Sequence, residues 1–143
     1  MESHNRVVPG CGFHHVALRV HDFDASVKFY KALGMTEAVL WGEGDYRAIL
    51  FDTGDGNYIE LFAGGKPGEK PQWGEGASWI HVALRTTDVE GATQKAVAAG
   101  AVLSKPPFDA VLGKTGGRQV KVRISFVHAP GGEVVEFFNS ADL

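Results

Sequence analysis

The pentapeptide His15-Val16-Ala17-Leu18-Arg19 occurs a second time as His81-Val82-Ala83-Leu84-Arg85, 66 residues further along the chain. The two copies continue in register without a gap, and eight of the twenty paired positions from 15 to 34 are identical. A later block repeats with an offset of 76, which pairs Glu60 with Glu136. One pentapeptide match can arise by chance, but two blocks in the same order indicate an internal duplication.

Each copy has the sequence pattern of a strand, a helix and three further strands. The opening residues alternate apolar and polar side chains, which is typical of a strand. Asp22 or Asp24 can cap the helix that follows, and Gly34 has the position of a C-terminal stop. The second copy repeats these signals with Asp88 and Gly100. Further strands are predicted over 37–41, 47–52 and 57–63 in the first copy, and near 102, over 121–128 and over 133–139 in the second.

The duplication predicts a single domain over residues 1–143, made of two units at 13–63 and 79–139. A linker is predicted over 64–78, because seven of its first thirteen residues are Gly or Pro. The change of offset requires ten extra residues in the second unit, within 108–119. We interpret these residues either as a mobile loop over a site or as a long hairpin connection.

The composition excludes several classes of protein. Hydrophobic residues make up 44% of the 143 residues and charged residues 22%, which argues against a disordered or fibrous chain. No apolar run reaches the roughly 18 residues of a membrane-spanning helix. The net charge of −3, without clusters of Lys and Arg, argues against nucleic acid or an anionic membrane as partner. A single cysteine, Cys11, excludes an internal disulfide and, with a polar amino terminus, predicts a cytoplasmic protein.

Strand alternation predicts which side chains share a face of the sheet. In the opening strand, Val16 and Leu18 form an apolar side that suits packing under the helix, so His15 faces the other way. In the last strand of the unit, Glu60 also faces away from the helix. The same pattern in the second unit puts His81 and Glu136 in equivalent places. The sequence therefore predicts two histidines and two glutamates on matching faces.

A divalent metal ion would explain why imidazoles and carboxylates share these faces. Burying a carboxylate is costly unless it is paired, protonated or bound to a cation. Nitrogen and oxygen ligands without cysteine are typical of catalytic sites with open coordination positions. Two other interpretations stay open, namely hydrogen-bonded strand histidines and glutamates paired with arginines across the sheet. The arginines are Arg19, Arg47, Arg85 and Arg123, which are also candidates for binding a substrate carboxylate or phosphate.

The stretch from His15 to Val20, with Asp22, Phe29-Tyr30 and Leu33-Gly34, resembles the opening signature of the glyoxalase/bleomycin resistance/extradiol dioxygenase superfamily, also called vicinal oxygen chelate. The resemblance extends over nearly the whole chain. It implies an α+β fold in which two tandem βαβββ units form a U-shaped, mostly antiparallel sheet around a metal cavity. The implied metal ligands are His15, Glu60, His81 and Glu136.

This His, Glu, His, Glu set is similar to that of bacterial-type glyoxalase I. The resemblance implies a metal-dependent lyase or isomerase that enolises a hemithioacetal, of glutathione or another thiol, or a related α-hydroxycarbonyl substrate. It also implies a homodimer and one divalent metal ion, which could be Ni, Zn, Mn, Co or Fe. Glu136 is the implied proton-transferring base, with Glu60 as the alternative. Glyoxalase I usually has a Thr-Tyr-Asn-type segment after its second ligand, where this chain has Leu61-Phe62-Ala63-Gly64-Gly65, so glutathione is not assigned.

Three alternatives within the superfamily stay open. An epimerase of an acyl-CoA-type substrate is similar, although such enzymes typically carry glutamine where this chain has Glu60. A non-catalytic binding or resistance protein would use the same cavity without the metal set. An Fe(II) dioxygenase would use two histidines and one glutamate. The identity and amount of bound metal would separate these classes.

Overall fold

The computed structural model describes residues 4, 6–7, 13–66, 80–113 and 118–143. Cys11 and residues 67–78 of the predicted linker lie outside the described residues. The elements are β1 (His15–Arg19), α1 (Phe23–Ala32), β2 (Thr36–Trp41), the short 3-10 helix η1 (Gly44–Tyr46), β3 (Ala48–Asp52), β4 (Tyr58–Phe62), β5 (Val82–Arg85), α2 (Val89–Ala98), β6 (Val102–Leu112), β7 (Val120–His128) and β8 (Val134–Asn139). This order confirms the predicted tandem βαβββ fold of the α+β class.

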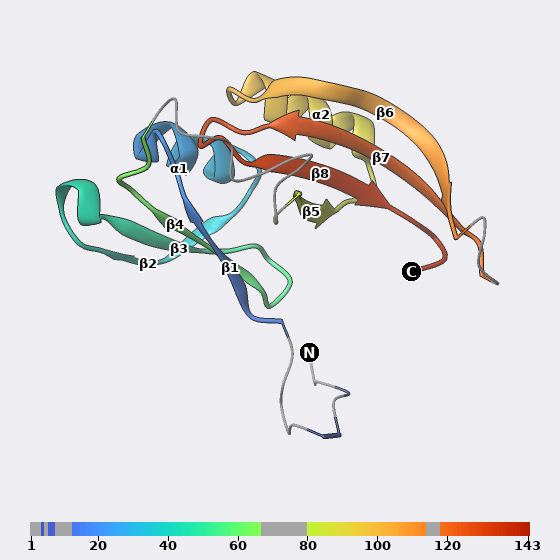
Figure 1. The fold of residues 1–143 in the computed structure, drawn as a ribbon, viewed down its shortest axis with the longest axis horizontal. Coiled ribbons are helices and arrows are strands. Elements are labelled where there is room, and N and C mark those ends of the chain that lie inside the picture. The colour runs from blue at the N-terminus through green and yellow to red at the C-terminus, as the bar shows by residue number, and fades with distance from the viewer. Residues whose placement is uncertain (1–3, 5, 8–12, 67–79, 114–117) are drawn as a thin grey trace.

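The strands form two four-stranded sheets with the same internal order, β1-β4-β3-β2 and β5-β8-β7-β6 (Figure 1). In each sheet the first and last strands of the unit pair in parallel, and the other pairings are antiparallel. The register is also repeated, because Ala17 pairs with Glu60 and Ala83 pairs with Glu136. The duplication seen in the sequence is therefore present in the strand register.

Both helices begin and end where the sequence predicts. The carboxylates of Asp22 and Asp88 each accept a hydrogen bond from the backbone N–H three residues later, at 3.0 and 2.9 Å. Such a cap satisfies a donor that the first turn of a helix leaves free. Gly34 and Gly100 follow the helices with φ of +89° and +107°, which glycine adopts without strain. Asp22, and not Asp24, is the cap of α1.

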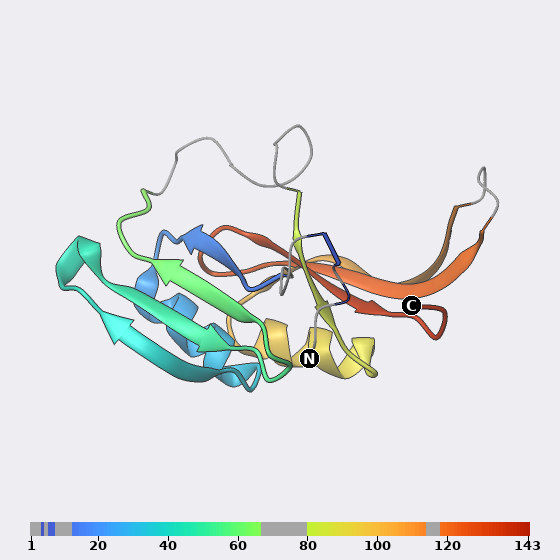
Figure 2. The same ribbon diagram turned by 90° about the horizontal axis from the view of Figure 1, so that it is seen from below.

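One hydrophobic core joins the two units. The helix-facing sides of both sheets contribute to a single cluster of buried side chains, and α1 contacts α2. Its members include Leu18, Phe29, Phe51, Ile59 and Leu61 from the first unit and Val89, Val127, Val135 and Phe137 from the second. The helices lie against one side of the sheets, as Figure 2 shows from below. The opposite faces of the sheets are therefore left for the candidate site.

The seam between the units also contains a buried polar contact. The hydroxyl of Tyr30 in α1 donates to Glu133 at 2.7 Å, and the backbone N–H of His21 donates to the carbonyl of Gly131 at 3.3 Å. A Cβ at Gly131 would lie 2.5 Å from a methyl of Val20 and 2.5 Å from the Glu133 carboxylate. Glycine is therefore required where the β7–β8 turn meets the first unit.

The ten extra residues of the second unit lengthen a hairpin. β6 runs from Val102 to Leu112, so residues 108–112 are strand and not loop. They pair with β7 at Phe108–Ile124 through Leu112–Val120. Figure 1 shows β6 and β7 as a curved arm that reaches well beyond β5 and β8. The hairpin interpretation holds for the described part, and residues 114–117 lie outside it.

Candidate metal centre

The first unit presents one histidine and one glutamate on the face away from α1. His15 Nε2 lies 3.6 Å from Glu60 Oε2, and both residues come from neighbouring parallel strands. The other ring nitrogen, Nδ1, lies 2.9 Å from Nδ1 of His14, whose ring stacks on Tyr58 at 5.0 Å. Strand alternation predicts that His14 points away from His15. That prediction is wrong, because His14 precedes β1, where strand alternation does not yet apply. The contact holds the His15 ring with Nε2 directed at Glu60.

The second unit repeats the pair in a less exposed setting. His81 Nε2 lies 2.9 Å from Glu136 Oε2, and the His81 ring packs edge-on against Phe126 at 5.5 Å. Glu136 is only 6% exposed. Burial raises the pKa of the Glu136 carboxyl above its ordinary value, and the adjacent His81 opposes that shift. A carboxyl with a raised pKa is a stronger base once it is ionised.

The four predicted ligands are brought together as two pairs. Within the described part of the chain, no three His, Cys, Asp or Glu side chains lie close enough together to bind one metal ion. Each pair supplies one imidazole nitrogen and one carboxylate oxygen, which are donors that suit Zn, Mn, Fe, Co or Ni. The donor chemistry therefore fits a divalent metal, but one pair supplies only half of the predicted ligand set.

The four candidate arginines are not brought together. By strand alternation, Arg19 and Arg85 project from the face that carries the pairs. Arg19 lies over the Phe62 ring and donates to the Ala63 carbonyl at 2.9 Å. Arg85 forms an ion pair with Asp55 at 3.6 Å.

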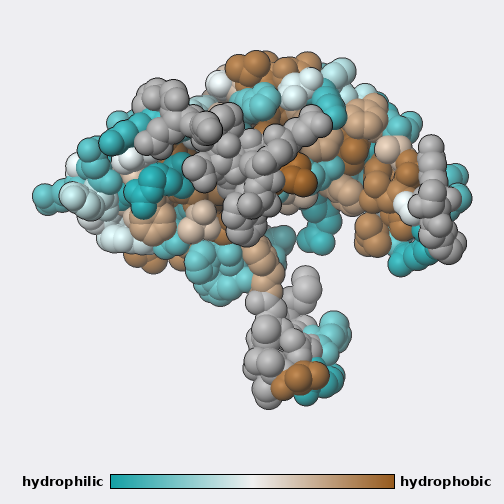
Figure 3. All heavy atoms as spheres, viewed as in Figure 1, coloured by the Kyte–Doolittle hydropathy of each residue, from teal (hydrophilic) through white to brown (hydrophobic). Residues whose placement is uncertain are grey.

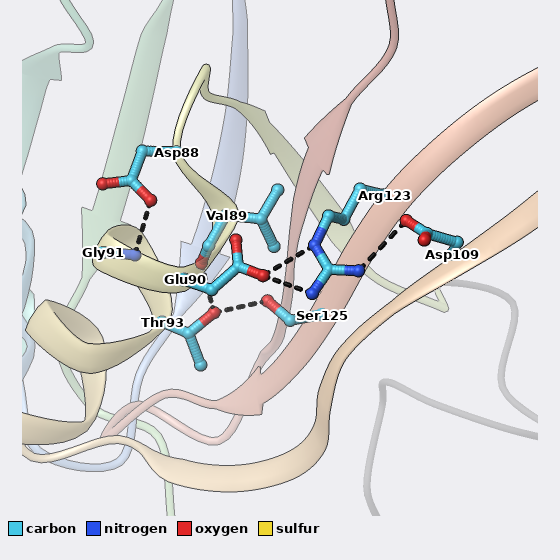
Figure 4. Close-up of polar contacts among 8 residues, drawn as sticks. All are labelled: Asp88, Val89, Glu90, Gly91, Thr93, Asp109, Arg123 and Ser125. Carbon is cyan, nitrogen blue, oxygen red and sulfur yellow. Dashed lines mark hydrogen bonds and ion pairs between the residues drawn. The ribbon is translucent and has the colours of Figure 1, made fainter.

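Arg47 and Arg123 lie on the helix side of their sheets. Arg47 forms an ion pair with Asp24 of α1 at 3.1 Å. Arg123 donates to Glu90 of α2 and, at 3.0 Å, to Asp109 of β6, as Figure 4 shows. The role of the four arginines in substrate binding stays a prediction.

A second hydrophobic cluster adjoins the Glu136 pair. It consists of Val120, Val122 and Ile124, with Ala110, Phe126 and Phe138 packed against them. In register, Phe126 is opposite Glu136 and Ile124 is opposite Phe138, and directly paired residues project from the same face. The face that carries the second pair therefore continues into an apolar floor, which sequence reasoning did not identify.

A cavity of about 570 Å³ lies between the two units. It is walled by apolar side chains from the helix-facing sides, such as Val16, Ile59 and Leu84, and polar residues including Arg85 and Lys95 stand at its edge. His81 also contributes to the wall, but His15, Glu60 and Glu136 do not. The cavity therefore borders the second pair at His81 but does not include the other three candidate ligands.

The sequence matches one family model over residues 12–137, described as the Glyoxalase/Bleomycin resistance protein/Dioxygenase superfamily. The chain belongs to this superfamily. The match covers both His–Glu pairs and both helices. A search of curated protein sequences finds no significant match.

Solved structures show the same fold at low sequence identity. A glyoxalase-related enzyme from Fulvimarina pelagi is 19% identical with a TM-score of 0.62, over 89% of this chain and 86% of that one. A mutant of the fosfomycin resistance protein FosX from Listeria monocytogenes, complexed with Mn(II) and 1S,2S-dihydroxypropylphosphonic acid, is 19% identical with a TM-score of 0.63, over 88% and 87%. TioX from Micromonospora sp. ML1 is 21% identical with a TM-score of 0.62, over 90% and 98%. These likenesses establish the fold of this superfamily member and not its activity.

No helix in the described residues is long and apolar enough to cross a membrane.

Proposed function

We propose that this chain is a metal-dependent lyase or isomerase of the glyoxalase I type. The observation that carries the proposal is the repeated pair, His15 with Glu60 and His81 with Glu136, at equivalent register positions of two equivalent sheets. The fosfomycin resistance protein of the same fold was solved with Mn(II), which supports a metal in this class of site. The proposed substrate is a hemithioacetal or a related α-hydroxycarbonyl compound.

The proposed metal site is shared between two copies of the chain. Because one chain brings its four candidate ligands together only as separate pairs, the pair of the first unit in one copy would be completed by the pair of the second unit in another. A two-fold dimer would then contain two such sites. The open faces that carry the pairs are the surfaces that would meet.

A bound divalent ion would supply Lewis acidity at the two adjacent oxygens of the substrate. Glu136 would take the proton from the carbon next to the carbonyl and return it to the neighbouring carbon. Its burial, its raised pKa and its 2.9 Å contact with His81 favour it over Glu60, whose side chain is more exposed. The apolar surroundings of Phe126 and Ile124 would keep water away from the proton during transfer.

The first test combines metal analysis with one substitution. We expect stoichiometric divalent metal in the purified or reconstituted chain, and turnover in a screen of hemithioacetals and α-hydroxycarbonyl compounds. Glu136→Gln should retain much of the metal but lower turnover by about a hundredfold to ten-thousandfold, the usual cost of removing a general base. Glu133→Gln is the matched control and should leave turnover unchanged, because Glu133 is a buried carboxylate of the second unit that contacts Tyr30 instead of His81.

Two outcomes would contradict the proposed class of enzyme, and a third would contradict only the choice of Glu136 as the base. A chain that stays free of metal after reconstitution would indicate a binding or resistance protein. Iron as the only activating metal, with oxygen consumption on a catechol, would indicate a dioxygenase. If Glu136→Gln turned over as fast as the parent chain, the base would have to be Glu60 or another group.

A further inference from the structure

A lysine lies on the same sheet face as the second His–Glu pair. Lys105 of β6 is opposite Phe126 of β7, and Phe126 is opposite Glu136 of β8. These three side chains form one row across the sheet and project from the same face. Two strand spacings separate Lys105 from Glu136, which corresponds to about 9–10 Å between their backbones.

The Lys105 ammonium is held over an aromatic ring and has no acidic partner in the described part of the chain. Its Nζ lies 5.4 Å from the centre of the Phe126 ring, and that ring lies 5.5 Å from the His81 ring. Among the described residues, no ion pair or hydrogen bond to the Lys105 ammonium is found. Arg47 and Arg123, in contrast, are both paired with carboxylates on the helix side. Within the described residues, Lys105 is therefore a charge without a counter-ion on the same sheet face as the second pair.

The sheet surface next to Lys105 is apolar. The partly exposed side chains there are Phe126, Phe138 and Ala110, which pack over Val122 and Ile124, themselves 4% and 8% exposed. Figure 3 shows hydrophobic residues gathered over the curved β6–β7 arm. Side chains of this kind offer no hydrogen bonds, so they suit a flat hydrocarbon body better than a peptide.

We propose that Lys105 is a specificity-determining residue that binds an anionic group of the substrate. The inference rests on the proposed metal-dependent function. The substrate class that fits is an elongated anion, with two adjacent oxygens at the His81–Glu136 end, a flat apolar or aromatic body on Phe126, and a carboxylate or similar group at Lys105. The anionic group is thus distinct from the oxygens that the metal binds.

The experiment compares three catechols that share the two adjacent oxygens and the ring. They are 3,4-dihydroxybenzoate, its neutral amide 3,4-dihydroxybenzamide, and catechol itself. Affinities are measured by calorimetry on the full chain loaded with Zn(II), which avoids oxidation. The benzoate should bind about tenfold more tightly than the benzamide, because a charged hydrogen bond replaces a neutral one. Lys105→Gln should abolish this difference by weakening the benzoate alone.

The controls separate charge, ring and location. Lys121→Gln removes a lysine of the same sheet from the opposite face and should change neither affinity. Phe126→Leu should weaken all three ligands while the metal content stays unchanged. Circular dichroism would check that each variant is folded.

Other outcomes would overturn either the role of Lys105 or the proposed function as a whole. A metal-loaded chain that binds benzoate and benzamide equally, or a Lys105→Gln variant that keeps the preference, would overturn the role of Lys105 and leave the proposed function intact. If the benzoate bound as tightly without metal as with it, the ligand would lie elsewhere. That result would also overturn the role of Lys105. A chain that takes up no metal would overturn the proposed function together with this inference.

Discussion

Glu133 is more deeply buried than Glu136, yet it lies at the seam between the units and away from the faces that carry the candidate metal ligands. It is 2% exposed and accepts a hydrogen bond from the fully buried hydroxyl of Tyr30 at 2.7 Å. Burial raises the pKa of the Glu133 carboxyl, while the Tyr30 hydrogen bond and the charge of His21 oppose the shift. Burial and the neighbouring carboxylate raise the pKa of Tyr30 well above its ordinary value, so Tyr30 remains a donor.

The raised pKa of Glu133 predicts that the protein loses stability as the pH rises. The unfolded carboxyl ionises near its ordinary pKa of 4.5, whereas the folded one keeps its proton to higher pH. The unfolded state therefore binds fewer protons in this interval, and the free energy of unfolding falls with pH. Glu133→Gln should reduce the loss of stability as the pH rises above the ordinary pKa of 4.5, measured by urea unfolding. At about pH 5 it should change stability by less than about 1 kcal/mol, because the amide oxygen still accepts from Tyr30.

A variant whose stability falls with pH as steeply as that of the parent chain would show that Glu133 does not carry this dependence. Tyr30→Phe provides a second comparison. It removes the donor and leaves the carboxyl buried without its partner, so it should destabilise the fold by about 1–3 kcal/mol.

At the scale of elements, local sequence signals set where each of the two helices begins and ends, and packing against the sheets then stabilises them. Each is ten residues long, which is too short to be stable alone in water, so packing against the sheets must supply most of its stability. The caps decide where each helix begins. Thr93 of α2 also bonds to Ser125 of β7 at 2.7 Å (Figure 4), which fixes the helix on its sheet.

The cap of α1 can be tested against a neighbouring aspartate. Asp22→Ala should lower the free energy of unfolding by about 1 kcal/mol, because the N–H of Ala25 loses its partner. Asp24→Ala is the matched control and should cost less than about 1 kcal/mol, because it removes only an exposed ion pair with Arg47. Denaturant unfolding would measure both. A larger loss for Asp24→Ala would mean that the ion pair matters more than the cap.

At the scale of the whole molecule, the arrangement of the units decides where a complete site can form. The helix-facing sides of both sheets are buried in one shared core. The His–Glu pairs are consequently left on separate open faces, which a second copy of the chain can cover. A site within one chain and a site between two chains make different predictions for mixed variants.

His15→Ala and His81→Ala should each lose metal when purified alone. Mixing the two variants after unfolding and refolding them together should restore metal to about one quarter of the parent level, because half of the dimers are mixed and each regains one intact site of two. Metal analysis of the refolded mixture measures this directly. If each site lay within one chain, mixing would restore nothing. Refolded mixtures of each variant with itself are the control.

The sequence alone was enough for the order of elements and for the choice of candidate ligands. Alternation in short strands, carboxylates before helices and glycines after them are local patterns, so they could be recognised without knowing the fold. The equivalence of His15 with His81 and of Glu60 with Glu136 followed from the duplication. The ends of β6 could not be predicted as well, because Pro106-Pro107 and two irregular pairings interrupt the alternation.

The tertiary structure decided what local patterns do not encode. The pairing of Arg47 with Asp24 and of Arg123 with Glu90, the seam around Glu133, and the row from Lys105 to Glu136 all join residues that are distant in sequence. Above all, the shared core determines that one chain presents its candidate ligands as two separate pairs. Residue types and spacing determine which groups can bind a metal, whereas the packing of the two units determines which of them can meet.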